Sequence, residues 1–218
     1  AERLGVEYVW TGEAWGYDAL TPLAFLAGRT STVKLGTSIV QVGARTPAMV
    51  AMSALSIDSI SGGRFILGLG VSGPQVIEGW HGVRFDRPVQ RTRELIEIVR
   101  IISRGERLSY EGQVHRLPLP DSQGRALRPR TQPAEIPIYV AALGPQNLRL
   151  TGELAQGWIG DSFMPETAEV FLQYIREGAR QAGRSLEEID LCVPASLEFT
   201  DHVDEVAKEY ARGFAFAL

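Results

Sequence analysis

Residues 68–73, GLGVSG, match the pattern G-x-G-x-x-G, whose glycines in dinucleotide-binding proteins let the backbone approach a pyrophosphate. That chemistry requires the motif to lie in the first strand-to-helix turn, a helix to begin at its third glycine, and an acidic residue to follow about 20 positions later. Here the motif follows the third apolar run, turn-forming residues come next, and Arg93 stands twenty positions beyond Gly73. The match is therefore a coincidence, and the glycines need another explanation.

Side chains that could transfer a proton or act as a nucleophile are sparse. Glu13 follows the apolar run 7–10, and a carboxylate there could accept a hydrogen bond or a proton, or could equally pair with a neighbouring arginine. Cys192 falls in an apolar run and is expected to be inert core, whereas Trp80 is expected either to cover a pocket or to pack. The histidines lack metal-ligand spacing and are expected to be structural or solvated: His81, His115 and His202. We predict no metal site and no nucleophile-and-base pair.

Six apolar runs, each followed by a helical pattern, organise the chain. They are rich in Val and Ile and nearly continuous, as strands buried on both faces of a parallel sheet are. The runs are 7–10, 33–42, 64–70, 136–143, 157–163 and 189–199. Six consecutive strand-helix units leave two options, an open doubly wound sheet or a closed barrel.

Helix boundaries are marked by caps. Thr21-Pro22 and Thr46-Pro47 each offer an N-cap followed by proline at the first helical position. Gly62-Gly63 and Gly105 are expected to close helices, and Gly5 to close a helix end at the start of the chain. Residues 107–135 contain turn residues, prolines and a short strand pair around Glu111-Gly112, and predict an ordered insertion over the end of a barrel.

Composition narrows the class of protein. Lys and Arg number 22 against 26 Asp and Glu in 218 residues, a formal net charge of −4 with no basic cluster, which disfavours nucleic acid as a partner. No apolar run reaches membrane-spanning length and no signal peptide opens the chain. The single cysteine rules out an internal disulfide framework and suits a cytoplasmic protein.

The ends of the apolar runs share an unusual composition of small residues with few titratable side chains. In (β/α)8 barrels the active site is built from the loops that follow the strands. Backbone without bulky side chains at those positions predicts a pocket for a large, flat cofactor. The stretches concerned are 10–13, 38–41, 70–73, 142–145 and 160–162.

Three stretches, GGRFILGLGVSGPQVIEGWHG, LGTSIVQVGARTPAMVAM and PIYVAALGPQNLRLTGELAQGW, resemble the luciferase-like superfamily of flavin and deazaflavin oxidoreductases. The likeness is greatest to the branch that uses coenzyme F420, the group of methylene-tetrahydromethanopterin reductase, and it runs across nearly the whole chain. It implies a (β/α)8 TIM barrel of the bacterial luciferase-like type, with the deazaflavin at the carboxyl face, and a homodimer. The six runs would be strands two to seven, so residues 1–218 would be one barrel domain truncated at both ends.

The resemblance also implies site residues. The turn before the helix at Gly144 would bind the cofactor phosphate, and Ser38-Ile39 would form a non-prolyl cis peptide whose bulge presses on one face of the ring. Glu13 takes the place of an acidic residue near the rings and is the expected catalytic residue. The expected cofactor-binding residues are Ser38, Ile39, Ser72, Ala142, Leu143, Gly144, Pro145 and Gln146.

Two departures from the family limit what it implies about substrates. Sugar-phosphate and alcohol dehydrogenases of this family have a histidine where this chain has Ala14, and a glutamate in the loop that here contains Ser72, Gly73 and Pro74. Their substrates are therefore not carried over. The first hypothesis is an oxidoreductase that moves a hydride between coenzyme F420 and a small organic substrate. The alternatives are an FMN-dependent luciferase-like monooxygenase and a non-catalytic barrel that serves as a binding partner.

Overall fold

The computed structural model describes residues 2–161, 163–195 and 199–217. Six strands form one parallel sheet in chain order, without a reversal, and β3 (Val40–Gln41) pairs with β4 beside them. The six are β1 (Tyr8–Thr11), β2 (Lys34–Thr37), β4 (Phe65–Gly70), β7 (Ile138–Ala141), β8 (Gly157–Ile159) and β9 (Asp190–Cys192). This order is that of an incomplete (β/α) barrel, and it excludes the doubly wound alternative.

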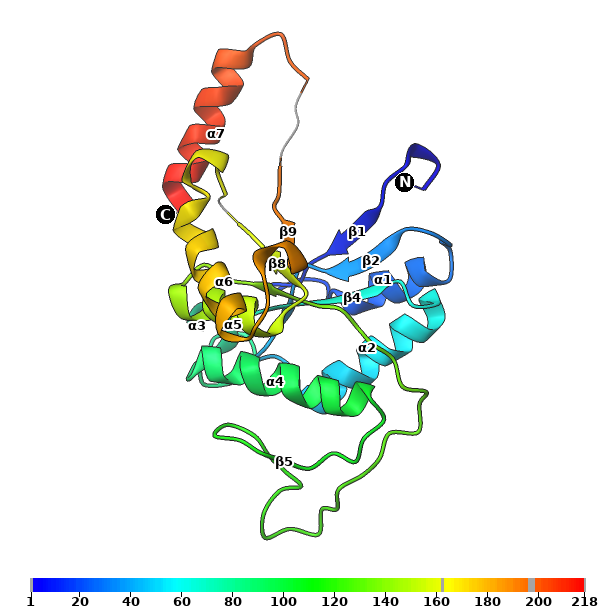
Figure 1. Cartoon of the computed structure of the whole chain (residues 1–218). Helices are drawn as coiled ribbons and strands as arrows, with labels where there is room; N and C mark the ends of the chain where they lie inside the picture. The colour runs from blue at the N-terminus through cyan, green and yellow to red at the C-terminus, as the bar shows by residue number, and fades with distance from the viewer. Residues whose placement is uncertain (1, 162, 196–198, 218) are drawn as a thin grey trace.

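The helices form a layer outside the sheet, in which each main helix packs on the next (Figure 1). They are α1 (Leu20–Ala27), α2 (Pro47–Ser61), α4 (Pro88–Ser103), α5 (Pro145–Leu154) and α6 (Glu169–Gln181), with the short α3 (Pro74–Ile77) after β4. Every residue of β4 is buried, as the continuous apolar run predicts. The carboxyl ends of the strands are therefore supported by a packed core.

The cap at Thr46 is confirmed and the cap at Thr21 is wrong. The Thr46 side chain accepts a hydrogen bond from the Met49 N–H, and α2 ends at Gly62 with φ 69°. Helix α1 instead begins at Leu20, because Asp18 Oδ1 accepts hydrogen bonds from the N–H groups of Leu20 (2.9 Å) and Thr21 (2.8 Å). Because the Asp18 carboxylate accepts from two free N–H groups, Asp18 and not the Thr21 hydroxyl caps this helix.

Glycines end further turns as expected, but most of the apolar runs are longer than the strands they contain. Gly105 follows α4 with φ 73°, and Gly5 closes a 3₁₀ turn (Glu2–Leu4) with φ 75°. The run 33–42 is divided into β2 and β3, and within the described residues of the run 189–199 the strand is limited to β9. Ser162 and residues 196–198 lie outside the described residues.

The segment between α4 and β7 contains the expected short strand pair, β5 (Tyr110–Glu111) antiparallel to β6 (Arg116–Leu117). The segment was expected to lie over the end of the barrel. It packs instead on α2 and α4 (Figure 1). The buried Glu94 carboxylate on α4 fixes it there by accepting hydrogen bonds from successive N–H groups of residues 113–115.

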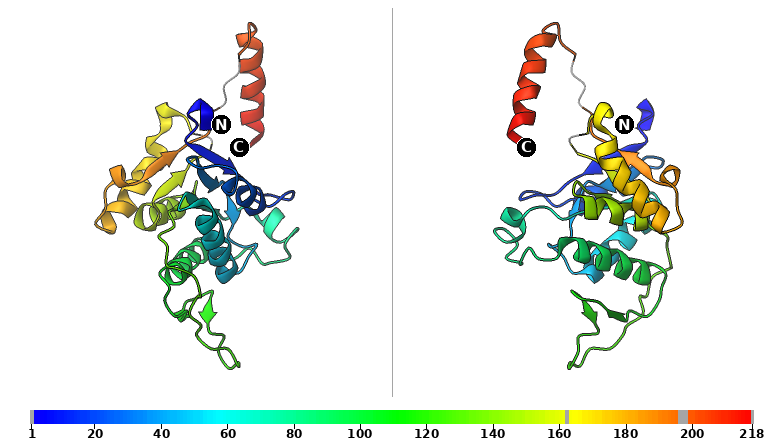
Figure 2. Two further views of the ribbon diagram at one scale, coloured as in Figure 1. Left: turned by 90° about the vertical axis from the view of Figure 1, so that its right-hand side faces the viewer. Right: turned by 60° about the vertical axis from the view of Figure 1, so that its left-hand side comes forward.

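Helix α7 (Val203–Ala217) stands away from the sheet in both views of Figure 2. Two further 3₁₀ turns, Pro165–Thr167 and Leu186–Glu188, lead into α6 and β9. In the part of the chain that the structure describes, no helix is both long and apolar enough to cross a membrane.

Candidate functional site

A cavity of about 820 Å³ opens at the carboxyl ends of the strands. Residues from the ends of β4, β7 and β8 and from the first turns of α5 form its walls. The structure brings together there Glu13, Ile39, Ser72, Ala142, Leu143, Gly144, Pro145 and Gln146. All of these were singled out from the sequence, whereas Ser38 does not line the cavity. The position agrees with the rule that barrel sites lie at this end.

The glycines of the GLGVSG stretch make room for neighbouring strands. A methyl group on Gly68 would lie 1.8 Å from the Thr37 carbonyl oxygen, and one on Gly70 would lie 2.7 Å from Ile39 Cγ1. The peptide between Ser38 and Ile39 is cis, as expected, and Gly12 lies against it, since a methyl group there would be 2.6 Å from the Ser38 carbonyl oxygen. The glycines therefore allow Ile39 to reach the cavity wall.

The first turn of α5 borders the cavity, and among the described residues nothing accepts a hydrogen bond from its Gln146 and Asn147 N–H groups. Gly144 is the N-cap and has no side-chain hydrogen bond to offer, Pro145 follows it, and the first helical bond runs from the Leu148 N–H to the Gly144 carbonyl oxygen at 3.0 Å. A methyl group on Gly144 would meet no atom within 4 Å, and its φ of −79° requires no glycine. A helix start with free N–H groups and open space in front of it can bind an anion such as a phosphate.

Asp161, in the predicted stretch 160–162, lines the cavity, but sequence reasoning missed two other polar residues of its wall, Asn147 and Arg149. Asn147 is 8% exposed, and its Oδ1 has no hydrogen-bond partner among the described residues. Arg149 is tied to α6, where Nε donates to Glu177 at 2.8 Å and the guanidinium lies over the Tyr174 ring. An asparagine inside the first turn of a predicted helix could have drawn attention, but its burial could not be read from the sequence.

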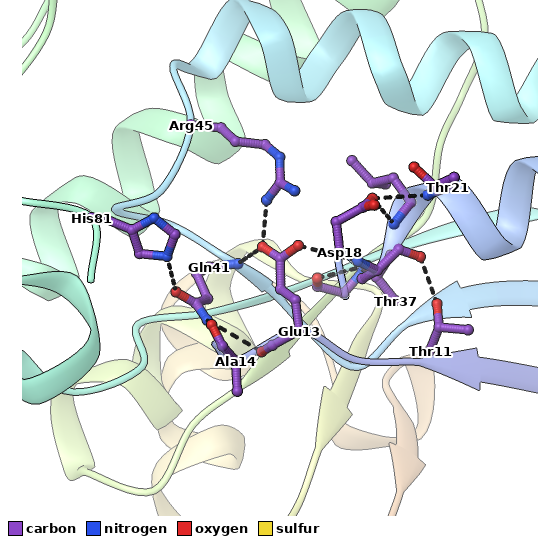
Figure 3. Close-up of polar contacts among 12 residues, drawn as sticks. Thr11, Glu13, Ala14, Asp18, Thr21, Thr37, Gln41, Arg45 and His81 are labelled. Carbon is purple, nitrogen blue, oxygen red and sulfur yellow. Dashed lines mark hydrogen bonds and ion pairs between the residues drawn. The ribbon is translucent and has the colours of Figure 1, made fainter. Parts of the chain in front are cut away.

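The Glu13 carboxylate is paired with an arginine (Figure 3), which is one of the two alternatives the sequence left open. Its Oε1 forms an ion pair with Arg45 and accepts a hydrogen bond from the Gln41 N–H at 3.0 Å, and Oε2 accepts one from the Ala19 N–H at 3.2 Å. Only 7% of the Glu13 side chain is exposed. With both oxygens bonded, Glu13 joins the loop after β1 to the segment around β3.

Gln41 extends this network to the loop after β4. Its Nε2 donates to the carbonyl oxygens of Glu13 (3.2 Å) and Ala14 (2.9 Å), so its Oε1 faces His81 Nε2 at 2.9 Å (Figure 3). Because Gln41 Oε1 can only accept, His81 donates from Nε2. Three loops at the mouth of the cavity are thus fixed to one another by side chains that do not depend on a ligand.

The other residues that the sequence singled out lie outside the cavity wall. Trp80 is 65% exposed and lines no part of the cavity, so it neither covers the cavity nor packs. Cys192 lies in β9, half-buried, where burial raises the pKa of its thiol. His115 contributes its backbone N–H to Glu94, and His202 is exposed. Among the described residues, no three His, Cys, Asp or Glu side chains are grouped as metal ligands would be.

Comparison with known proteins identifies the class. The model of the luciferase-like monooxygenase family matches residues 1–217, and the chain belongs to that family. A protein of Mycobacterium tuberculosis, named as a coenzyme F420-dependent oxidoreductase, is 46% identical over 210 residues, which are 92% of this chain and 60% of the relative. The 5,10-methylenetetrahydromethanopterin reductase of Archaeoglobus fulgidus is 32% identical over 213 residues, 97% of this chain and 61% of the relative.

A solved structure agrees with the fold. The coenzyme F420-dependent tetrahydromethanopterin reductase of Methanopyrus kandleri superposes with a TM-score of 0.78 at 29% identity, covering 88% of this chain and 58% of that chain. The chain thus spans about three fifths of the length of these relatives.

Proposed function

We propose that this chain binds coenzyme F420 and transfers a hydride between the deazaflavin and a small organic substrate. The observation that supports this most directly is the open start of α5, with free N–H groups and an unobstructed Gly144, in a cavity at the strand carboxyl ends. The names of one relative, an F420-dependent oxidoreductase, and of one solved structure, a coenzyme F420-dependent tetrahydromethanopterin reductase, support the same coenzyme.

The residues present fit such a coenzyme. The N–H groups of Gln146 and Asn147 at the start of α5 would hold the phosphate. Ile39, Ala142 and Ile159 provide apolar walls that would hold a flat ring and exclude water. The bound coenzyme supplies the hydride chemistry, and the chain supplies position and a shielded face.

Glu13 has a positioning role in this proposal. Its carboxylate is already engaged by Arg45 and two N–H groups, so it holds the loops beside the ring in place. The dehydrogenase pair of histidine and glutamate is replaced here by Ala14 and the Ser72–Pro74 turn. We therefore assign neither a sugar phosphate nor a secondary alcohol as the substrate. A homodimer in the cytoplasm remains a prediction.

Titration of the protein with F420 and, separately, with FMN tests the proposal. We expect the F420 fluorescence to change on binding with a dissociation constant in the micromolar range, at least tenfold below that for FMN. Reduced F420 should then be oxidised, or oxidised F420 reduced, when a substrate is added, as followed by absorbance. Binding of FMN without F420 would favour the monooxygenase alternative, for which the RslO1 monooxygenase of Streptomyces bottropensis (25% identical, TM-score 0.77) offers a structural parallel.

A further inference from the structure

The wall of the cavity carries no excess of positive charge. Among the described residues that line it, Arg149 is the single cation, and the acidic side chains are Glu13 and Asp161. Arg45, which does not line the cavity, forms an ion pair with Glu13. A phosphate at the start of α5 would therefore be held chiefly by the free N–H groups and the dipole of that helix.

Arg149 is itself held by a carboxylate on the neighbouring helix. It stands one turn after Pro145, and helical side chains lean toward the amino end of their helix, so that it borders the cavity at the start of α5. Its Nε donates to Glu177 Oε2 on α6 at 2.8 Å, and its guanidinium lies 4.7 Å from the centre of the Tyr174 ring. The side chains of the pair are 37% and 34% exposed, and a pair this exposed adds little to stability. Glu177 thus cancels the one positive charge of the wall.

The charge on a ligand decides how well such a wall binds it. The cost of removing an anion from water rises with the square of its charge, whereas its attraction to fixed dipoles rises only in proportion to the charge. A phosphodiester carries one negative charge, but a phosphomonoester carries about −1.5 to −2 at pH 7. A site that supplies dipoles and no uncompensated cation therefore favours the diester.

We propose that the pair of Arg149 and Glu177 makes this cavity selective for a phosphodiester, because Glu177 binds the guanidinium that would otherwise neutralise a second negative charge. The ligand class is a phosphodiester monoanion attached to a flat ring. The phosphate of F420 belongs to this class, whereas that of FMN is a monoester. The inference rests on the proposed function for the position of the phosphate at α5. Glu177 is a positioning residue, since it acts on the ligand through Arg149.

Two ligand pairs test the selectivity. In each pair a 5′-phosphate and its methyl ester share ring and polyol and differ in the charge of the phosphate. One pair has the flavin ring of FMN, and the other has the deazaflavin ring of F420. We expect the wild type to bind the methyl ester of its preferred ring at least threefold more tightly than the monoester, as measured by fluorescence titration.

Glu177→Gln should remove this preference. With Arg149 released, the monoester should bind at least fivefold more tightly than to the wild type, and the methyl ester less than twofold more tightly. Changing Arg149 and Glu177 to leucine together removes both charges, so this double variant should keep the wild-type preference. A merely structural role of the pair would not distinguish the two esters.

Glu169→Gln is a matched control on the same helix. Glu169 pairs with Arg176 at 2.9 Å, and neither residue lines the cavity. This change should leave both dissociation constants as they are in the wild type. Glu177→Gln and Glu169→Gln should each change the melting temperature by only a few degrees, as expected for exposed ion pairs.

Specific results would overturn the inference. Tighter binding of the monoester than of the methyl ester to the wild type would do so, as would an equal gain for both in Glu177→Gln. If the flavin pair binds with the expected preference and the deazaflavin pair does not bind, the proposed function fails and this inference stands. If the deazaflavin pair binds without a preference, this inference fails and the proposed function stands. If neither pair binds, both fail.

Discussion

Glu13 and Arg45 form an ion pair between the loop after β1 and the loop before α2, in which the Glu13 side chain is 7% exposed and that of Arg45 is 24% exposed. The same carboxylate accepts hydrogen bonds from the Gln41 and Ala19 N–H groups. A carboxylate that accepts from this many donors is held in one orientation. Its surroundings are those of a residue that fixes loops next to a binding site.

Glu13→Gln separates this positioning role from proton transfer. Because the amide replaces a charged partner of Arg45, we expect the free energy of unfolding to fall by about 2 kcal/mol. The turnover number at saturating coenzyme should fall by less than tenfold, whereas loss of a general acid or base costs about 10²–10⁴-fold. Denaturant unfolding and steady-state kinetics measure both quantities. Glu111→Gln, at a side chain that is 77% exposed, should change neither.

Gly144→Val tests the binding role of the α5 turn. A Cβ added at Gly144 would meet no protein atom within 4 Å, and the position needs no unusual φ, so the melting temperature should be nearly unchanged. The same side chain would project toward the expected phosphate, so the dissociation constant for F420 should rise at least tenfold.

Gly152→Ala, on the same helix, is the contrasting variant. Its methyl group would lie 2.0 Å from the Ile175 carbonyl oxygen, so it should lower the melting temperature. An unchanged F420 affinity of Gly144→Val would contradict the proposal that the phosphate binds at this turn.

Much of the fold was predictable because the apolar runs and the helix-capping residues indicate the same order of strands and helices. Each buried strand is a continuous apolar run, and Thr46-Pro47 and Gly62 mark both ends of α2 as expected. The misplaced start of α1 has a local cause, since the Asp18 carboxylate competes with Thr21 for the same role. Hydrogen-bonding strength, not residue type alone, decides which cap forms.

The candidate site was predictable only in part. Positions such as Gly144 and Ile39 follow from strand ends and family motifs, and the structure brings them to one cavity. The partners of Gln41 and the unpaired oxygen of Asn147 depend on which side chains meet across loops. Periodicity and spacing along one chain carry no information about such contacts.

Gln41→Met tests whether the three loops are fixed by this one side chain. Gln41 is 1% exposed, and its loss would leave the carbonyl oxygens of Glu13 and Ala14 and the His81 Nε2–H without their partner. We expect the free energy of unfolding to fall by about 3 kcal/mol, since each buried group left unpaired costs about 1–3 kcal/mol.

His81→Ala, which removes only the outermost partner, should cost about 1 kcal/mol. The double variant should cost less than the sum of the two, because both single changes remove the same hydrogen bond. Urea unfolding of the three variants measures this coupling, and strict additivity would contradict it.

The last prediction concerns Glu94 and the insertion that it fixes to α4. Burial alone would raise the pKa of Glu94, but hydrogen bonds from Gln90 and from the N–H groups of residues 113–115 outweigh it, and the pKa lies below its ordinary value of 4.5. A carboxyl group whose pKa is lowered by folding stabilises the protein above the unfolded pKa, and this stabilisation is lost as the pH falls through the folded value. Glu94→Gln should therefore lower the free energy of unfolding by about 2 kcal/mol near pH 7, because its amide cannot accept all these bonds.

The difference between the wild type and Glu94→Gln should shrink once the pH falls below 4.5, where the wild-type carboxylate becomes protonated. Burial lowers the pKa of His115 and the Glu94 carboxylate opposes this, so Glu94→Gln should lower the pKa of this imidazole further. Denaturant unfolding at several pH values measures the global effect, and amide hydrogen exchange at residues 113–115 measures the local one. A difference that stays constant from pH 7 to pH 3 would show that the Glu94 charge does not hold the insertion.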